Sequence, residues 1–304
     1  MKKKIIIDTD PGIDDAAALA IALTNPKLEV AMISTVAGNV NVNYTTENAK
    51  KILDFFEKQT PLAKGNSIPL LKEYEDASLI HGETGMGGYD FPKSERSLLA
   101  EHAVYEMQKR ILASTKKVTL VTIGPLTNIA LLLNMYPEVK SQIAEIVMMG
   151  GSTIGGNTNS SAEFNFKVDP HAVQIVLNSG LDLTVFGLRV TTKALLTKKD
   201  IAELKTLGET GKMLYSIFSH YRGGDIDQAG LMMHDICTIC YLLKPEIFDF
   251  QETNFEIAVS GPAAGTTVAD LDNRYSIEKN VKLAVKIKEK QFRDWMLAEI
   301  AKLK

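Results

Sequence analysis

The sequence has little cysteine and no long apolar segment. Its only two cysteines, Cys237 and Cys240, have no second pair with which to complete a zinc site, and they lie in an apolar helical pattern, so we expect two packed core side chains. No apolar run approaches the roughly 18 residues of a membrane span. After Met1 and the lysines at 2–4, only three isoleucines precede Asp8, which is too short for a signal peptide. We therefore expect a cytosolic protein with no membrane partner.

Charge of one sign is also lacking. The chain has 34 lysines and arginines against 37 aspartates and glutamates, for a formal net charge of −3, and the two signs are mixed along the sequence. This balance gives no reason to expect nucleic acid as a partner. With 45% hydrophobic residues the chain can bury a full core. Since no repeat, low-complexity tract or charge block divides it, we expect a single domain over 1–304.

What the sequence does have is an alternation of strand-like and helical segments from end to end. We expect strands at 5–7, 30–36, 118–123, 146–149, 183–186, 255–259 and 281–287, and helices at 16–23, 45–58, 98–113, 168–177, 198–207, 211–221 and 291–303. This order is typical of an α/β fold with an open, mostly parallel, Rossmann-like sheet and helices on both faces. Ligands bind outside the carboxyl ends of the strands in such sheets.

Several of the expected connections are rich in glycine or polar residues. Residues 81–88 predict a mobile loop, and 155–165 predict a second long loop. Residues 222–225 interrupt the helical pattern, and 232–235 open the helix that carries the cysteines. A polar cluster spread over the chain but always at strand ends is typical of a single pocket.

Four carboxylates follow the first apolar run within eight residues: Asp8, Asp10, Asp14 and Asp15. Pro11-Gly12 predicts a turn between them, so the last two aspartates fall in the first turn of a helix. A helix dipole can stabilise one or two carboxylates, but four would repel one another and raise each other's pKa. A bound cation would resolve this repulsion, and oxygen ligands without cysteine or histidine suit Ca²⁺ or Mg²⁺.

The run from Asp8 to Asp15, Asp-Thr-Asp-Pro-Gly-Ile-Asp-Asp, resembles the N-terminal signature of the nucleoside hydrolases. This inosine-uridine-preferring family cleaves the N-glycosidic bond of ribonucleosides. Further segments resemble the family over almost the whole chain, at 35–39, 124–128, 157 with 163–165, and 234–235. The resemblance implies the nucleoside hydrolase fold and hydrolysis of purine and pyrimidine ribonucleosides to ribose and free base.

Two other functions stay open. An Asp-x-Asp after a strand also begins the haloacid-dehalogenase-like phosphatases, in which Asp8 would be the nucleophile of a magnesium-dependent reaction. In those enzymes a threonine usually follows the second aspartate closely, whereas Pro11-Gly12 follows here. The second alternative is a calcium-dependent sugar-binding module without catalytic activity.

The resemblance also implies a role for each site residue. Ca²⁺ would be held by the carboxylates of Asp10, Asp15 and Asp235 and by the backbone carbonyl of Ile123, and would bind the attacking water and the ribose hydroxyls. Asp10 would also be the general base, and Asp8 would steady the metal ligands. The side chains expected to orient the ribose are Asp14, Asn39, Asn157, Glu163 and Asn165.

The base would face two histidines. His234 would protonate or hydrogen-bond the departing base, and His81 would lie on a loop that closes over it. Residues 81–86, 219–222 and 232–237 look most like the non-specific ribonucleoside hydrolases. Arg189 stands where relatives often carry aspartate. The family's dimers and tetramers imply a homo-oligomer, and its chemistry implies a place in nucleoside salvage.

Overall fold

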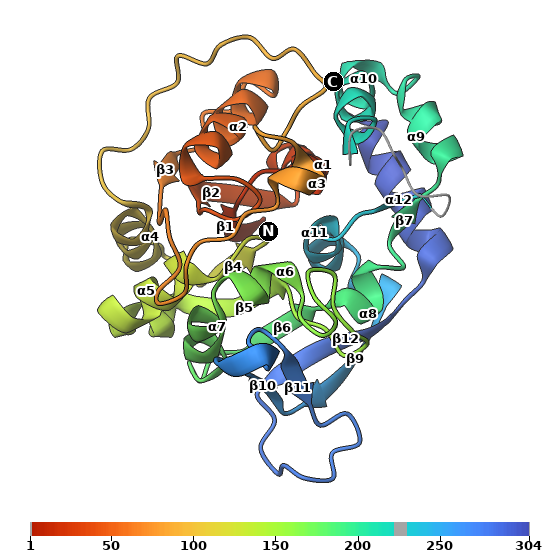
Figure 1. Ribbon diagram of the computed structural model, residues 1–304. Helices are drawn as coiled ribbons and strands as arrows, with labels where there is room; N and C mark the ends of the chain where they lie inside the picture. Colours follow the sequence, from red (N-terminus) through yellow and green to blue (C-terminus); the bar gives the residue numbers. More distant parts are fainter. Residues whose placement is uncertain (1, 222–229, 304) are drawn as a thin grey trace.

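The centre of the molecule is an eight-stranded sheet (Figure 1). The computed structural model describes residues 2–221 and 230–303, so the predicted interruption at 222–225 lies outside the described residues. The strands are β1 (Lys3–Thr9), β2 (Leu28–Thr35), β3 (Leu62–Lys64), β4 (Val118–Thr122), β5 (Ile143–Met149), β6 (Leu183–Phe186), β9 (Phe248–Thr253) and β12 (Val281–Ile287). Their order is β3-β2-β1-β4-β5-β6-β12-β9. All neighbours pair in parallel except β12 and β9, which confirms the predicted fold class.

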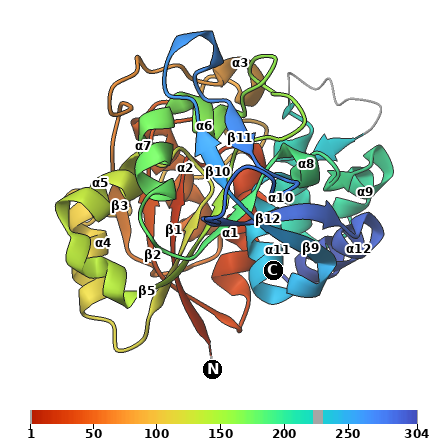
Figure 2. The same cartoon turned by 90° about the horizontal axis from the view of Figure 1, so that it is seen from below.

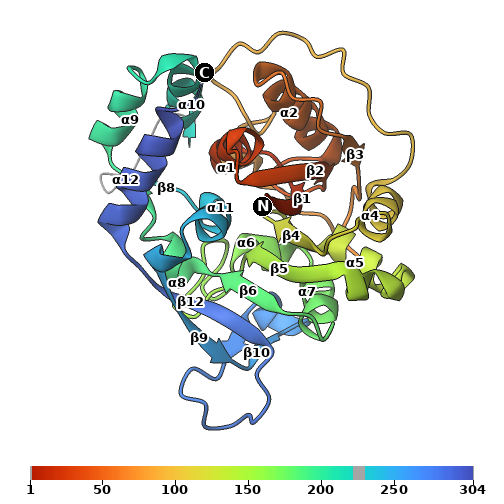
Figure 3. The ribbon, with the colours of Figure 1, turned by 180° about the vertical axis from the view of Figure 1, so that it is seen from behind.

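Helices cover both faces of this sheet. The helices of the described residues are α1 (Ile13–Thr24), α2 (Val42–Phe55), α3 (Ser78–His81), α4 (Ala103–Leu112), α5 (Thr127–Met135), α6 (Phe164–Val168), α7 (Pro170–Leu177), α8 (Leu188–Thr191), α9 (Lys198–Leu204), α10 (Gly208–Phe218), α11 (Ile236–Leu243) and α12 (Glu289–Ile300). Ile5 and Ile7 pack in one core with α1 and α11, and Ile6 packs in the other with α4 and α5. Because β1 is buried on both faces, it is a continuous apolar run. Figure 3 shows α4 and α5 on one side of the sheet and α1 and α11 on the other.

The loops that carry the predicted site residues lie at the carboxyl ends of the parallel strands. In Figure 2 the chain enters β1 near the N-terminus, and α3, α6 and the β10–β11 pair lie beyond the opposite ends of the strands. β10 (Phe255–Ile257) pairs antiparallel with β11 (Thr267–Ala269), so the strand expected at 255–259 is not part of the main sheet. The antiparallel edge strand β9 was not predicted from the sequence.

Local side chains explain two further differences from the predicted elements. The helix expected from 98 begins at Ala103, where the His102 ring accepts the Val104 N–H at 3.3 Å. The helix expected over 168–177 is divided, because the Asp169 carboxylate caps a second helix by accepting the Ala172 N–H at 3.0 Å. Each change of element therefore follows from a capping side chain.

The region around the cysteines also differs in part. β7 (Leu195–Leu196) pairs antiparallel with β8 (Leu231–Met232), so 231–232 form a strand and the helix opens only at Ile236. Cys237 and Cys240 are free and buried, which confirms the prediction of two core side chains. No helix within the described residues is long and apolar enough to cross a membrane.

Candidate active site

The site begins where β1 ends and α1 starts. Asp15, in the first turn of α1, accepts a hydrogen bond from the Thr9 hydroxyl at 2.6 Å with one carboxylate oxygen and from the Gly12 N–H at 2.9 Å with the other. The carboxylate thereby joins the end of the strand to the N-terminus of the helix. The turn between them is held in one conformation, with Asp10 as its first residue.

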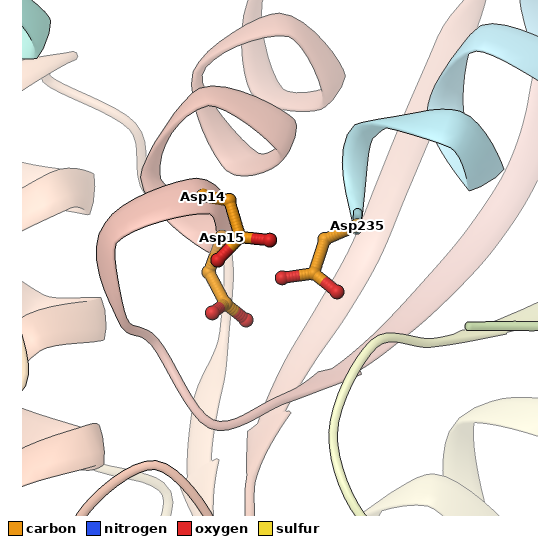
Figure 4. A group of neighbouring side chains, drawn as sticks. All are labelled: Asp14, Asp15 and Asp235. Atoms are coloured by element: carbon orange, nitrogen blue, oxygen red, sulfur yellow. The ribbon is translucent and has the colours of Figure 1, made fainter. Parts of the chain in front are cut away.

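Three carboxylates from two distant segments meet beside this turn. Asp14 and Asp15 lie at the start of α1, and Asp235 lies at the start of α11 (Figure 4). One oxygen of each lies within 4.8 Å of the others. Asp15 and Asp235 are buried. These three side chains could hold a metal ion, as the sequence predicted for two of them.

Asp10 is fully buried next to the group. Its Oδ2 accepts the Asn39 N–H at 2.7 Å, whereas its Oδ1 has no hydrogen-bond partner among the described residues. A β-carbon at Gly124 would lie 2.6 Å from that Oδ1, so the peptide after Ile123 approaches the carboxylate as closely as only glycine allows. A buried carboxylate oxygen without a partner is unfavourable, and a cation coordinated there would satisfy it.

Burial raises the pKa of these aspartates. The pKa of Asp15 is raised to about 7, mainly by burial and then by the charge of Asp14. Burial, followed by the charge of Asp15, raises the pKa of Asp10 well above its ordinary range. The pKa of Asp235 rises in the same way, through burial and the neighbouring aspartates. Carboxylates that resist ionisation until a counter-charge arrives are a donor set that fits a hard cation.

Two of the predicted ribose residues hydrogen-bond to residues that were predicted to bind the metal. The Asn39 amide nitrogen donates to Asp15 Oδ2 at 3.2 Å and to the Asp10 carbonyl at 3.1 Å. Asn165 donates to the Ile123 carbonyl at 3.3 Å and to the Met149 carbonyl at 3.2 Å. The structure therefore brings Ile123, whose carbonyl was predicted to bind metal, within one hydrogen bond of a predicted ribose residue.

Of the other three predicted ribose residues, Asp14 belongs to the carboxylate group itself, and Asn157 and Glu163 precede Asn165 in the chain. Glu163 caps α6: its carboxylate accepts the N–H groups of Asn165 at 2.9 Å, Gly151 at 2.9 Å and Phe166 at 3.1 Å. Burial raises the pKa of Glu163 to about 7 even though these hydrogen bonds lower it. Asn157 is exposed, and its side-chain oxygen accepts the Phe164 N–H at 3.0 Å. Asn157 lies on the loop before α6, and within the described residues its side chain makes no hydrogen bond to the buried carboxylates.

The two histidines border the aspartates from different elements. His81 Nδ1 accepts the Ile13 N–H at 3.3 Å, and His234 donates its backbone N–H to Asp14 Oδ2 at 3.2 Å. Burial lowers the pKa of both rings, although the charge of Asp14 opposes this effect. His81 was expected in a loop but ends the one-turn helix α3. Asp76 holds that turn by accepting from Ser78 N–H and hydroxyl at 3.1 and 2.8 Å.

Asp8 faces away from this group. Its Oδ1 accepts from Asn128 at 2.8 Å and from the Ser34 hydroxyl, and it lies in the interior of β1 with 1% exposure. These contacts join β1 to β2 and α5. The sequence had instead predicted that Asp8 would steady the metal ligands. A carboxylate so enclosed is also inaccessible as the nucleophile of a phosphatase.

Some residues of the site were missed by sequence reasoning. Asn48, in α2, donates to the Pro11 carbonyl at 3.0 Å and to the Thr84 carbonyl at 2.7 Å, so it connects the turn at Asp10 to the loop after His81. Thr191 hydrogen-bonds the His234 ring at 2.8 Å. A polar residue within an amphipathic helix gives no sequence signal of such a contact.

Arg189 donates to Thr153 at 2.8 Å, which ties α8 to the loop before Asn157.

The fold and the buried carboxylate group together define an α/β enzyme with a candidate metal centre at the carboxyl ends of its strands. Residues 5–294 match the family model described as inosine-uridine preferring nucleoside hydrolase. The chain belongs to this family, which confirms the resemblance seen in its motifs and makes it a nucleoside hydrolase.

Individual relatives agree with this assignment. The chain is 46% identical over 302 residues to the non-specific ribonucleoside hydrolase RihC of Klebsiella pneumoniae, covering 99% of each chain. It is 46% identical over 293 residues to the Salmonella enteritidis protein of the same name, covering 96% of this chain and 95% of the other. Among solved structures, the purine-preferring ribonucleoside hydrolase from Gardnerella vaginalis superposes with a TM-score of 0.91 at 31% identity, covering 99% of this chain and 98% of that one.

Proposed function

We propose that this enzyme hydrolyses both purine and pyrimidine ribonucleosides to ribose and free base, with Ca²⁺ at the aspartate group. The observation that carries the proposal is the meeting of buried carboxylates from the starts of α1 and α11 next to the end of β1. The breadth of substrates is supported by the name non-specific ribonucleoside hydrolase of the 46% identical relatives.

The ligands we assign to the ion are the carboxylates of Asp10, Asp15 and Asp235 and the carbonyl of Ile123. Asp10 is included because its buried Oδ1 has no partner among the described residues, and Asp14, whose oxygen lies within 4.8 Å of those of Asp15 and Asp235, is assigned to the ribose. An all-oxygen set suits Ca²⁺. When bound, the ion would lower the pKa of a water and offset the charge of the aspartates.

The chain's own side chains would carry the remaining chemistry. Asp10 would take the proton of the attacking water as general base. The transition state would have oxocarbenium character at C1′, so stabilisation of the departing base matters as much as the attack. His234 would hydrogen-bond or protonate that base, and His81 would close the pocket from α3.

The ribose would be oriented by amides and carboxylates, because each hydroxyl needs both a donor and an acceptor. The residues we assign to it are Asp14, Asn39, Asn157, Glu163 and Asn165. We expect the enzyme to act in the cytoplasm in nucleoside salvage, as a homodimer or homotetramer, with free ribonucleosides as its small-molecule partners.

Incubation with inosine and with uridine, followed by chromatography for hypoxanthine and uracil, tests this function. Both bases should appear with wild-type protein and neither with Asp10→Ala. Release from only one nucleoside would contradict the broad specificity. Binding of ribose without base release would favour the sugar-binding module, and release of phosphate from a phosphomonoester would favour the phosphatase.

A further inference from the structure

We propose that the Thr191 hydroxyl fixes His234 in the tautomer that carries its proton on Nε2, so that the ring presents a hydrogen-bond donor to the substrate. That the substrate is a ribonucleoside rests on the proposed function, whereas the assignment of the tautomer does not. Thr191 is therefore a positioning residue that acts through His234.

The scaffold places the two residues side by side although 43 positions separate them. Thr191 ends α8, and three residues later the Ala194 carbonyl accepts the Met233 N–H at 2.8 Å. This bond extends the antiparallel pairing of β7 with β8 and brings His234 next to Thr191. α8 is itself anchored, since Leu188 N–H donates to the Gly151 carbonyl at 3.0 Å.

The hydrogen bond between Thr191 Oγ1 and His234 Nδ1 is 2.8 Å long, and its direction follows from the surroundings. The hydroxyl of the neighbouring Thr192 donates to the Leu188 carbonyl at 2.6 Å, whereas the Thr191 hydroxyl has no backbone carbonyl as acceptor among the described residues. Thr191 is fully buried, and within the described part of the chain its hydroxyl bonds only the histidine. If Nδ1–H donated, the hydroxyl hydrogen would be buried without an acceptor, which is unfavourable. The hydroxyl therefore donates, Nδ1 accepts, and the neutral ring carries its proton on Nε2.

A second contact fixes the His234 backbone, and within the described residues the ring makes its hydrogen bond through Nδ1 and none through Nε2. The His234 backbone N–H donates to Asp14 Oδ2 at 3.2 Å, so the residue is held at its backbone and at Nδ1. A base that leaves a ribonucleoside gains negative charge on its ring atoms, and a fixed N–H donor stabilises that charge. The other tautomer would present a lone pair to the base. No proton needs to be transferred for this effect.

Enzyme kinetics can separate this role from a structural one. Thr191→Val keeps the shape of the side chain and removes the hydroxyl, and Thr191→Ser keeps the hydroxyl. Thr210→Val is the matched control, because Thr210 is also fully buried but its hydroxyl has no partner among the described residues. We expect Thr191→Val to lower kcat on inosine and uridine roughly ten-fold and to leave p-nitrophenyl riboside, whose leaving group needs no donor, nearly unchanged. Thr191→Ser should recover most of the loss, and Thr210→Val should match wild type.

A double-mutant cycle then tests the path through the histidine. In a His234→Ala background, Thr191→Val should cause no further loss. An equal additional loss there, or an equal loss on nucleosides and on p-nitrophenyl riboside, would overturn the proposal and assign Thr191 to packing.

The tautomer can be measured without turnover. In wild-type protein labelled with ¹⁵N-histidine, the signals of His234 are identified by their disappearance in His234→Asn. We expect an unprotonated Nδ1 and a protonated Nε2, and a mixture of tautomers in Thr191→Val. A protonated Nδ1 in wild type would overturn the proposal. If the protein released no base from any nucleoside, the proposed function would fail while this spectrum still decided the tautomer.

Discussion

Asp10→Asn isolates the proton-accepting role of Asp10 from its place in the fold. Asp10 Oδ2 accepts the Asn39 N–H at 2.7 Å, and an asparagine oxygen can accept the same bond. The new amide group would occupy the position of Oδ1, which has no hydrogen-bond partner among the described residues. The substitution thus keeps the volume and the one hydrogen bond of the carboxylate and removes its basicity.

The magnitude follows from the two roles assigned to the side chain. General base catalysis is worth about 10²–10⁴ in rate, which corresponds to roughly 2.7–5.4 kcal/mol. The amide NH2 also replaces the oxygen assigned to the cation, so we expect at least a hundred-fold loss of kcat for base release at saturating calcium. Retention of more than about a tenth of wild-type kcat, a loss below about 1.4 kcal/mol, would refute the general-base role.

Asp8→Asn provides the matched control for this experiment. Asp8 lies in β1, two residues before Asp10, and burial raises its pKa to about 7, but its contacts are with Ser34 and Asn128. The same carboxylate-to-amide change should therefore leave most of the activity. If both variants lost activity equally, the effect of Asp10→Asn would reflect disturbance of the buried strand end rather than loss of a base.

Three further predictions concern the metal, pH and the loop after His81. Chelation should abolish base release and lower the melting temperature, and Ca²⁺ should restore both; zinc without calcium in elemental analysis of the native protein would refute the calcium assignment. Burial raises the folded-state pKa of Glu163 to about 7, above its unfolded value, so its contribution to stability falls as pH rises from about 5 to 8. The melting temperature of Glu163→Gln should therefore depend less on pH than that of wild type. Equal slopes of melting temperature against pH in the two proteins would contradict this. Asn48→Ala removes the bonds to Pro11 and Thr84 and should lower kcat/KM by about ten-fold, whereas unchanged kinetics would mean that the loop closes without this link.

The parts of the site that could be predicted from the sequence are those with a local signal. Asp10, Asp14 and Asp15 lie within six residues of one another, and their position after an apolar run is enough to place them at a strand end. Asp235 is different. Nothing in its neighbourhood in the sequence shows that α11 packs against α1, and it entered the predicted site only through the family resemblance.

The parts that could not be predicted depend on tertiary hydrogen bonds. Thr191 meets His234 because β7 pairs with β8, and each of these strands is only two residues long, too short for a periodic pattern. Asn48 is buried in α2 together with Thr45 and Thr46, and the residue types alone do not show which polar side chains of the helix turn inward. β9 follows the 3-10 helix Pro245–Ile247 and is buried only at its two ends, Phe248 and Thr253, so it lacks the continuous apolar run of a central strand.

From the electrostatics of the carboxylate group we expect the proposed cation to stabilise the fold as well as to serve catalysis. The N-termini of α1 and α11 both point at the group (Figure 4), and each helix dipole stabilises negative charge by about 0.3–2 kcal/mol. Removal of a carboxylate from water costs several kcal/mol, and Asp10, Asp15 and Asp235 are all buried. Two dipoles cannot offset three such charges, so we expect the proposed cation to supply the difference. Activity and melting temperature should therefore rise together, with the same midpoint, as calcium is added back to chelated protein. Full thermal stability in the chelated state would mean that the aspartates are neutralised by protons and that the ion serves catalysis alone.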